Sequence, residues 1–201
     1  MPIAAEGVRE ASAADRAALA ASLAEAFFDD PVSIWCIPPE HLRRPVLTRF
    51  FAEYVRQKER YGTVWCDESR AGAAVWAPPG KSKMSIRDTI AMLSKVFHPR
   101  LAPRGPMLGI GALQTERKQP KAQDFFYLAA LGVDPSAQGR GLGSKLLQPA
   151  LDICDEDRVG AYLESSKPDN VDFYARHGFR VVGEHRLPRG PVIPLMYRDP
   201  A

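Results

Sequence analysis

The chain has 201 residues, of which 45% are hydrophobic and 25% are charged, a composition typical of a folded globular protein and not of a disordered or fibrous one. Its 27 basic and 24 acidic residues give a net charge of +3, and the basic residues are scattered without interleaved aromatic residues, so we expect no nucleic-acid partner. No stretch approaches eighteen consecutive apolar residues, so we expect no membrane partner either.

The cysteines and the first residues of the chain favour the cytoplasm. The three cysteines, Cys36, Cys66 and Cys154, are odd in number and show neither a C-x-x-C pair nor ligand spacing, which argues against a disulfide framework and a zinc ribbon. The first ten residues lack the basic and apolar regions of a signal peptide. The four histidines show no ligand spacing, and we expect no metal.

Residues 1–124 alternate apolar helical faces with two short β-rich runs. Ser12 and Asp15 resemble a capping box that opens the first helix, whose residues Leu19, Leu23 and Phe27 fall on one face. The further elements predicted here are a helix over 46–60, strands over 63–66 and 73–77, a helix over 85–97 and a helix over 108–117. Because prolines punctuate residues 99–123, we interpret about 85–123 as a helical insertion or lid.

Residues 125–201 show a different pattern, which begins with an uninterrupted apolar run over 125–133. Such a run is typical of a strand buried on both faces. The elements predicted after it are a helix over 141–155, a strand over 161–164, a short helix over 170–177 and strands over 179–182 and 193–197. Strands alternating with helices predict a mixed α/β sheet, and we expect one domain over 1–201.

A glycine-rich turn, Gln138-Gly139-Arg140-Gly141-Leu142-Gly143-Ser144, directly follows the apolar strand and opens an amphipathic helix. Glycines let backbone N–H groups approach an anion closely, and a helix N-terminus adds partial positive charge. The turn therefore predicts a phosphate site, although a solvated turn that needs glycine only for its backbone angles remains an alternative.

Two other phosphate motifs fit this turn less well. A Walker loop requires Gly-Lys-Ser/Thr, whereas this chain has Gly143-Ser144-Lys145. A dinucleotide fingerprint fits Gly139 and Gly141 but meets Ser144 where a third glycine or alanine belongs. Because Glu164 follows some twenty residues later, a dinucleotide-dependent oxidoreductase stays open as an alternative.

The segment Val133–Gly143 resembles the acetyl-CoA signature of the GNAT N-acetyltransferase superfamily, Q/R-x-x-G-x-G/A after a strand that ends in V-x-P. The similarity covers about 125–197. It includes Leu163–Ser166, Asn170–Tyr174 and Leu187–Pro191, where the chain resembles the puromycin N-acetyltransferase branch in particular.

The resemblance implies an α/β fold with a mixed, mostly antiparallel sheet whose fourth and fifth strands splay apart, flanked by helices. Residues 1–124 would be the acceptor-side half and residues 125–201 the acetyl-CoA-binding half. Gly132, within an apolar strand, also indicates a bulge or a close backbone approach. The implied acetyl-CoA contacts are Leu131, Gly132, Val133, Gln138, Gly139, Arg140, Gly141, Leu142, Gly143, Ser144 and Asn170.

Acetyl transfer to an amine needs a group that takes the amine proton and a group that protonates the departing thiolate. Tyr174 is the predicted acid, and the alternative is core packing. Glu164 is the predicted base, and the alternative is a structural partner of Arg176 or Arg180. Asp29 and Asp30 follow the first helix and are candidates to attract a cationic acceptor.

The predicted function is acetyl transfer from acetyl-CoA to a primary amine of a small molecule by direct attack in a ternary complex. The branch resemblance suggests an aminonucleoside or another amine antibiotic as the acceptor. A non-catalytic acyl-CoA-binding module is the alternative from a different class. We expect a monomer or a homodimer.

Overall fold

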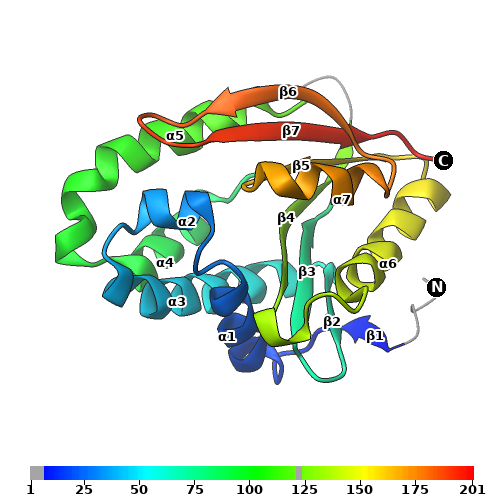
Figure 1. The fold of residues 1–201 in the computed structure, drawn as a ribbon, viewed down its shortest axis with the longest axis horizontal. Helices are drawn as coiled ribbons and strands as arrows, with labels where there is room; N and C mark the ends of the chain where they lie inside the picture. The colour runs from blue at the N-terminus through cyan, green and yellow to red at the C-terminus, as the bar shows by residue number, and fades with distance from the viewer. Residues whose placement is uncertain (1–6, 121–123) are drawn as a thin grey trace.

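The computed structural model of the chain describes residues 7–120 and 124–201. A seven-stranded sheet runs through it in the order β1-β2-β3-β4-β5-β7-β6, with helices on both faces (Figure 1). All neighbouring strands are antiparallel except β4 and β5, which are parallel. The strands are β1 (Val8–Glu10), β2 (Val64–Asp67), β3 (Gly72–Ala77), β4 (Phe125–Val133), β5 (Gly160–Glu164), β6 (Arg180–Arg186) and β7 (Val192–Arg198). This confirms the predicted mixed, mostly antiparallel sheet.

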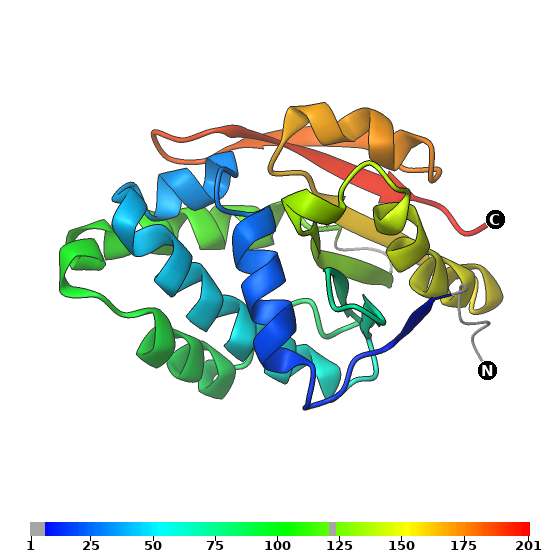
Figure 2. The same cartoon turned by 60° about the horizontal axis from the view of Figure 1, so that its bottom comes forward.

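The helices lie in two groups on opposite faces of the sheet (Figures 1 and 2). Their bounds are α1 (Arg16–Ala26), α2 (Pro31–Cys36), α3 (Glu40–Glu59), α4 (Ile86–Val96), α5 (Gly105–Lys118), α6 (Leu142–Glu156) and α7 (Val171–Ala175), with short 3-10 helices at Pro99–Arg104, Pro135–Ala137 and Pro168–Asn170. One hydrophobic core joins α6 and α7 to the sheet, and the other joins α1 and α3 to it.

Side chains of β4 contribute to both hydrophobic cores, because successive side chains of a strand point to opposite faces of the sheet. Phe126 and Leu128 belong to the core under α6 and α7, whereas Ala130 belongs to the core under α1 and α3. Tyr127 packs with the aromatic cluster of Phe125 and Tyr162. This double burial accounts for the apolar run in the sequence.

The predicted splay lies between β4 and β5. The two strands pair only over Phe125–Leu128 and Gly160–Leu163. Beyond that point β4 continues along β3 to Val133, so the edge of Ala129–Val133 that faces away from β3 has no strand partner. Apart from the Val133 carbonyl, which accepts from Gln138 Nε2, the backbone groups of this edge make no strand hydrogen bond among the described residues and can bond a ligand.

The bulge in β4 lies at Ala129, so the expectation of a bulge at Gly132 is wrong and the alternative of a close approach remains. Val75 is opposite Ala130 and Trp76 is opposite Leu128, so Ala129 is the extra residue. Gly132 stands in regular register, and a Cβ there would lie 2.7 Å from Cδ2 of Leu23. The glycine thus admits the close approach of α1.

Several elements differ from the predicted ones. Strand β1 and helix α2 were not predicted, because neither three residues nor six carry a readable periodicity. Helix α3 begins at Glu40 and includes Pro45, although the prolines before Val46 suggested a later start. The predicted insertion consists of α4, a 3-10 helix and α5, and its last residues, 121–123, lie outside the described part of the chain.

Candidate active site

The glycine-rich turn joins β4 to α6 in an open conformation. Gly139 and Gly141 both have φ of +76°, a left-handed backbone that favours glycine, and no atom lies within 4 Å of an ideal Cβ at either residue. Gly141 directly precedes α6, whose first N–H groups lack partners within the helix. This open backbone fits an anionic group such as a pyrophosphate, because the helix N-terminus is partly positive.

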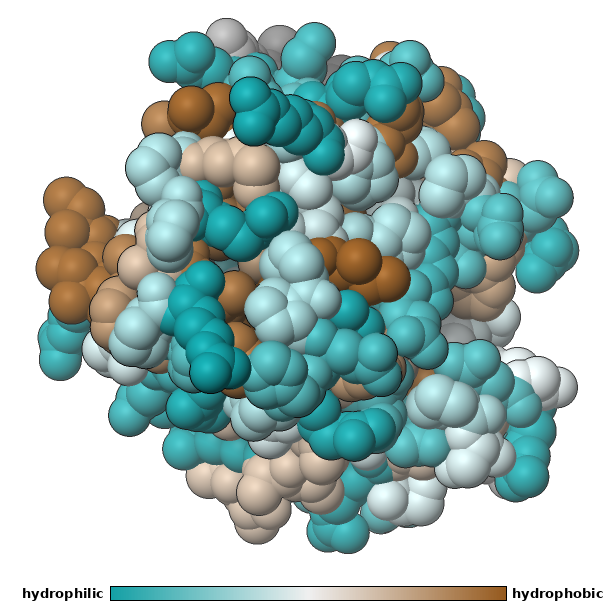
Figure 3. Space-filling model, turned by 60° about the vertical axis from the view of Figure 1, so that its left-hand side comes forward, coloured by the Kyte–Doolittle hydropathy of each residue, from teal (hydrophilic) through white to brown (hydrophobic). Residues whose placement is uncertain are grey.

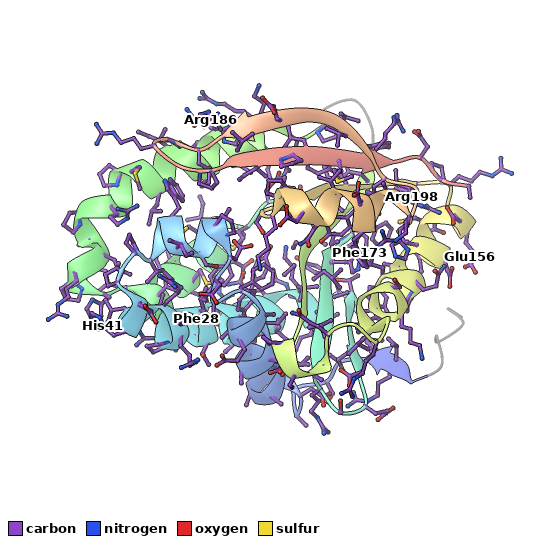
Figure 4. All side chains as sticks on the ribbon, in the orientation of Figure 1. Phe28, His41, Glu156, Phe173, Arg186 and Arg198 are labelled. Atoms are coloured by element: carbon purple, nitrogen blue, oxygen red, sulfur yellow. The ribbon has the colours of Figure 1, made fainter. Side chains whose placement is uncertain are left out.

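The other residues of the turn have structural partners. The amide Nε2 of Gln138 donates to the carbonyl of Val133 at 2.9 Å and closes the turn. A Cβ on Gly143 would lie 3.3 Å from Cζ of Phe173 on α7 (Figure 4). This glycine therefore lets α6 pack closely against α7. Ser144 Oγ and His177 Nε2 lie 3.0 Å apart.

A cavity of about 480 Å³ lies between the splayed strands and ends at this turn. Its walls are the free edge of β4, the start of α6, the end of β5 and residues of α7. Of all the predicted site residues, only Arg140 and Asp29 lie outside its lining. The splay, the free strand edge and the open turn together fit the pantetheine and phosphate parts of acetyl-CoA.

Tyr174 on α7 lines the cavity and is 7% exposed. Its ring makes edge contacts with Phe173 and Phe179 at centroid distances of 5.2 and 6.0 Å. Burial, with a smaller contribution from the charge of Asp30, raises the pKa of the Tyr174 hydroxyl. The residue packs in the core and is also a protonated donor at the cavity wall.

Glu164 ends β5 at the other side of the cavity. The hydroxyl of Tyr127 donates to its Oε2 at 3.2 Å, whereas its Oε1 is buried and has no hydrogen-bond partner in the described part of the chain. Burial raises the pKa of this carboxyl to about 7, and the hydrogen bond from Tyr127 limits the rise.

Neither Arg176 nor Arg180, the two structural partners considered for Glu164, pairs with it. Arg180 pairs with Asp199, and Arg176 lies 6.0 Å over the ring of Phe173. Within residues 7–120 and 124–201, no cation lies within ion-pair distance of Glu164. A buried carboxylate without a cation is costly, and such groups gather at functional sites.

Sequence reasoning missed a group of tyrosines that lies around Glu164. Tyr127 and Tyr162 are opposite each other in the parallel register, with ring centroids 6.1 Å apart, and the Tyr162 hydroxyl is buried without a partner. The charge of Glu164 contributes to the raised pKa of both, and also to that of Tyr54 on α3. The spacing of Tyr162 and Glu164, two residues apart on one strand, was the available signal.

Asp30 fastens α2 to the segment after β5. It is 2% exposed and caps α2 by accepting from the backbone N–H groups of Val32 and Ser33 at 2.9 and 3.2 Å. The Ser166 hydroxyl also donates to it. Asp29 is exposed and lies 3.9 Å from Arg43. Only Asp30 therefore contributes to the cavity wall.

Asn170 lies at the start of α7 and lines the cavity. It occupies the N-cap position, but its side chain makes no capping hydrogen bond. The side chain is thus available to a ligand.

Comparison with known proteins decides the family. A family model described as an acetyltransferase (GNAT) domain matches residues 67–195, which include β3, the splayed strands and the glycine-rich turn. The chain belongs to the GNAT acetyltransferase family. It is an acetyl-CoA-dependent N-acetyltransferase, and the oxidoreductase alternative is set aside.

Relatives of this acetyltransferase agree with that family but do not single out the puromycin branch. An uncharacterized N-acetyltransferase of Schizosaccharomyces pombe is 27% identical over 85% of this chain and 73% of its own length. A mycothiol acetyltransferase of Beutenbergia cavernae is 45% identical, over only 27% of this chain and 20% of its own length.

Solved structures share the fold of the acetyltransferase. A Corynebacterium glutamicum protein described as histone acetyltransferase HPA2 and related acetyltransferase has a TM-score of 0.68 at 22% identity, covering 96% of both chains. A polyamine N-acetyltransferase of Drosophila melanogaster has a TM-score of 0.59 at 17% identity, covering 96% of this chain and 98% of its own. At these identities the likeness concerns the fold alone.

Residues 7–120 and 124–201 of this acetyltransferase hold neither a candidate membrane span nor a candidate metal cluster. No helix among them is long and apolar enough to cross a membrane. No group of three or more histidine, cysteine, aspartate or glutamate residues among them is placed to hold a metal ion.

Proposed function

We propose that the enzyme acetylates a primary amine of a small molecule by direct attack in a ternary complex. One observation carries this proposal: Glu164 lines the cavity between the splayed strands, and its Oε1 is buried with no hydrogen-bond partner among residues 7–120 and 124–201. With a pKa of about 7, this carboxyl is ionised in a useful fraction at neutral pH. A base of that strength suits a protonated amine, which must lose a proton before it attacks.

The co-substrate end of the cavity has its own residues. Backbone groups from Gly139 to Ser144 would hold the pyrophosphate, and the free edge of β4 at Leu131–Val133 would bond the pantetheine. Asn170 would make a further contact. Acetyl-CoA supplies the acetyl group as an activated thioester.

The two titratable groups of the cavity divide the proton chemistry between them. Glu164 takes a proton from the acceptor amine, directly or through water. Tyr174 gives its hydroxyl proton to the sulfur that departs. Tyr174 is kept protonated by burial, whereas the carboxyl of Glu164 ionises near neutrality, so their pKa values differ in the direction that these two roles require.

The acceptor binds at the wall formed by Glu164 and Asp30, next to the tyrosine group. Because Asp30 is a carboxylate on the cavity wall, it favours a cationic acceptor even though its oxygens accept hydrogen bonds within the protein. The resemblance to the puromycin branch favours an aminonucleoside or another amine antibiotic. The fold-level neighbours named for agmatine and polyamine acetylation suggest compact alkylamines as a second set for testing.

The test is a panel of primary amines, from aminonucleosides to alkyl diamines, assayed for acetyl-CoA-dependent thiol release and for a product heavier by one acetyl group. We expect turnover with at least one amine and none with its tertiary analogue. Tight acetyl-CoA binding without thiol release across the whole panel would instead favour the non-catalytic module.

A further inference from the structure

Helix α4 presents its apolar side to the surface. Its exposed side chains are Ile86 (82% exposed), Ile90 (63%) and Leu93 (59%), continued by Phe97 (65%), which directly follows the helix. We call these four residues the α4 stripe. Figure 3 shows hydrophobic surface standing out from polar surroundings on the side of the molecule that carries α4. Isolated exposed apolar residues are ordinary, but a contiguous patch marks an interaction surface.

The opposite side of α4 is fixed to the protein. Asp88 and Met92 are buried, Arg60, directly after α3, pairs with the Asp88 carboxylate at 2.6 Å, and Gln57 Nε2 donates to the Asp88 carbonyl at 3.1 Å. Ser85 caps the helix by accepting from the Asp88 N–H at 3.1 Å. The helix therefore cannot rotate to hide the α4 stripe without breaking these contacts.

The spacing of the α4 stripe indicates what kind of surface covers it. Its residues are four, three and four positions apart, which is the a/d spacing of a helix that packs along another helix. The stripe is narrow: Arg87 and Ser94 border it on one side, and Thr89 borders it on the other. A helix that lies in a membrane surface presents a broader apolar face, so the spacing favours a partner helix.

We propose that the α4 stripe is covered by α4 of a second copy of the chain, packed antiparallel about a two-fold axis between Ile90 and Leu93. In this arrangement Ile86 of one copy lies against Phe97 of the other, and Ile90 against Leu93. The stripe is therefore its own complement, as a two-fold interface requires.

The helix dipoles favour this direction over a parallel pair. Arg87 is in the first turn of α4 and Lys95 is in the last, and an antiparallel pair places the partly positive N-terminus of each α4 beside the partly negative C-terminus of the other. Arg87 of each copy then faces Ser94 of the other. A parallel pair would instead align the two helix dipoles and bring the two Arg87 side chains to the same end.

The size of the contact sets its strength. Helix α4 has 11 residues, about 16 Å, so the contact lies at the small end of specific interfaces and the dimer is weak. No residue of the α4 stripe lines the active-site cavity, so each copy keeps its own complete site.

The first test measures mass against concentration by sedimentation, from about 1 µM to about 1 mM, the range in which a weak dimer converts to monomer. We expect the wild type to dimerise over this range and Ile90→Asp to stay monomeric. Leu113→Asp is the matched control, because Leu113 is an exposed leucine (55%) on α5 outside the α4 stripe. A wild type that is monomeric throughout, or a dimer that Ile90→Asp leaves intact, overturns the proposal.

The second test measures direction. Ile86→Cys and Phe97→Cys variants are prepared in a Cys36→Ser background and oxidised separately and as a mixture, because Cys36 is the partly exposed native thiol while Cys66 and Cys154 are buried. We expect disulfide-linked dimers mainly in the mixture. Links mainly within each separate variant would contradict the antiparallel arrangement. Circular dichroism checks that each variant is folded.

A lipid surface is the remaining occupant to exclude. Lys81, Lys83 and Arg87 line a second cavity, of about 550 Å³, near the start of α4, and such cations could attract anionic lipids. Co-sedimentation with vesicles of phosphatidylglycerol, compared with phosphatidylcholine, therefore accompanies the mass measurement. We expect no retention on either. Retention on phosphatidylglycerol that Ile90→Asp abolishes would assign the stripe to a membrane and overturn the proposal.

Discussion

The two ends of the active-site cavity differ in the groups that they offer to a ligand: one offers backbone N–H groups and the other offers side chains. At the end proposed for the co-substrate, the accessible groups belong to the backbone. Gly139 and Gly141 leave open space next to the N-terminus of α6. The end proposed for the acceptor depends on side chains, because Glu164 lies there beside a group of three tyrosines whose pKa values its charge helps to raise. One end binds through N–H groups that every residue carries, whereas the other depends on particular functional groups.

This difference predicts which substitutions should affect ligand binding and which should affect turnover. At the backbone end, a new side chain does harm through its charge or its backbone preference, and mainly affects binding. At the side-chain end, loss of one oxygen removes a proton donor or acceptor, and mainly affects turnover. The predictions below test that division, from the largest expected effect to the smallest.

Tyr174→Phe should give the largest loss. It keeps the ring contacts with Phe173 and Phe179 but removes the proton donor, so kcat should fall by about 10³-fold, within the range typical of general acids. Calorimetry should show acetyl-CoA affinity nearly unchanged. Turnover within a few-fold of wild type would make Tyr174 a packing residue only.

Glu164→Gln should lower kcat/KM by about 10²-fold near neutral pH. The wild-type rate should rise through pH 7, because the carboxyl, with a pKa of about 7, becomes an active base only when it ionises. The variant should lack this limb and recover as the pH approaches the pKa of the amine itself, about 10.4 for a lysine-like acceptor. Profiles of identical shape for the two enzymes would contradict the assignment of the base.

Gly141→Asp should weaken acetyl-CoA binding by about tenfold or more, at least about 1.4 kcal/mol, because a carboxylate would stand against the pyrophosphate. Gly141→Asn is the matched control, since asparagine has the same shape without the charge and tolerates a left-handed backbone. We expect calorimetry to show a clear loss for Asp relative to Asn. Equal acetyl-CoA affinities for the two variants would contradict the assignment of the pyrophosphate to this turn.

Tyr127→Phe should change the pH profile more than the maximal rate. The Tyr127 hydroxyl donates to Glu164 Oε2 and helps to hold down the pKa of that carboxyl. Without it, the acidic limb of kcat/KM should move to higher pH, and the rate at pH 7 should fall only a few-fold. A limb that stays in place would mean that another group titrates there.

The smallest effect concerns stability and its dependence on pH. The Glu164 carboxyl has a pKa of about 7 in the folded protein, raised from 4.5, so the folded protein holds its proton more tightly. The associated stabilisation is complete below about pH 4.5 and is lost as the pH rises through about 7. Relative to wild type, Glu164→Gln should therefore gain Tm by a few degrees at pH 8 and lose this gain near pH 4.5.

A Tm difference that is constant with pH would contradict the burial of an ionising carboxyl at this position. Loss of Tm at every pH would point instead to a structural role for Glu164. The measurement needs no substrate, so it separates the state of the carboxyl from its use in catalysis.

The sequence alone determined the co-substrate half. Strand β4 was predicted with its observed bounds, and α6 within one residue at each end, because a nine-residue apolar run and an amphipathic helix are local patterns. The position of the glycines was local too, since a left-handed backbone is a property of single residues. A motif carried by consecutive residues needs no long-range contact to be recognised.

Only the tertiary structure decided the acceptor half. Tyr54 and Glu164 are more than a hundred residues apart in the chain, and their neighbourhood depends on how α3 lies over the sheet. The sequence also left open whether Glu164 pairs with Arg176 or Arg180. In the structure Arg176 lies over the ring of Phe173 and Arg180 pairs with Asp199. The physical reason is that burial and charge pairing arise from contacts between distant segments, and these determine the pKa on which the chemistry depends.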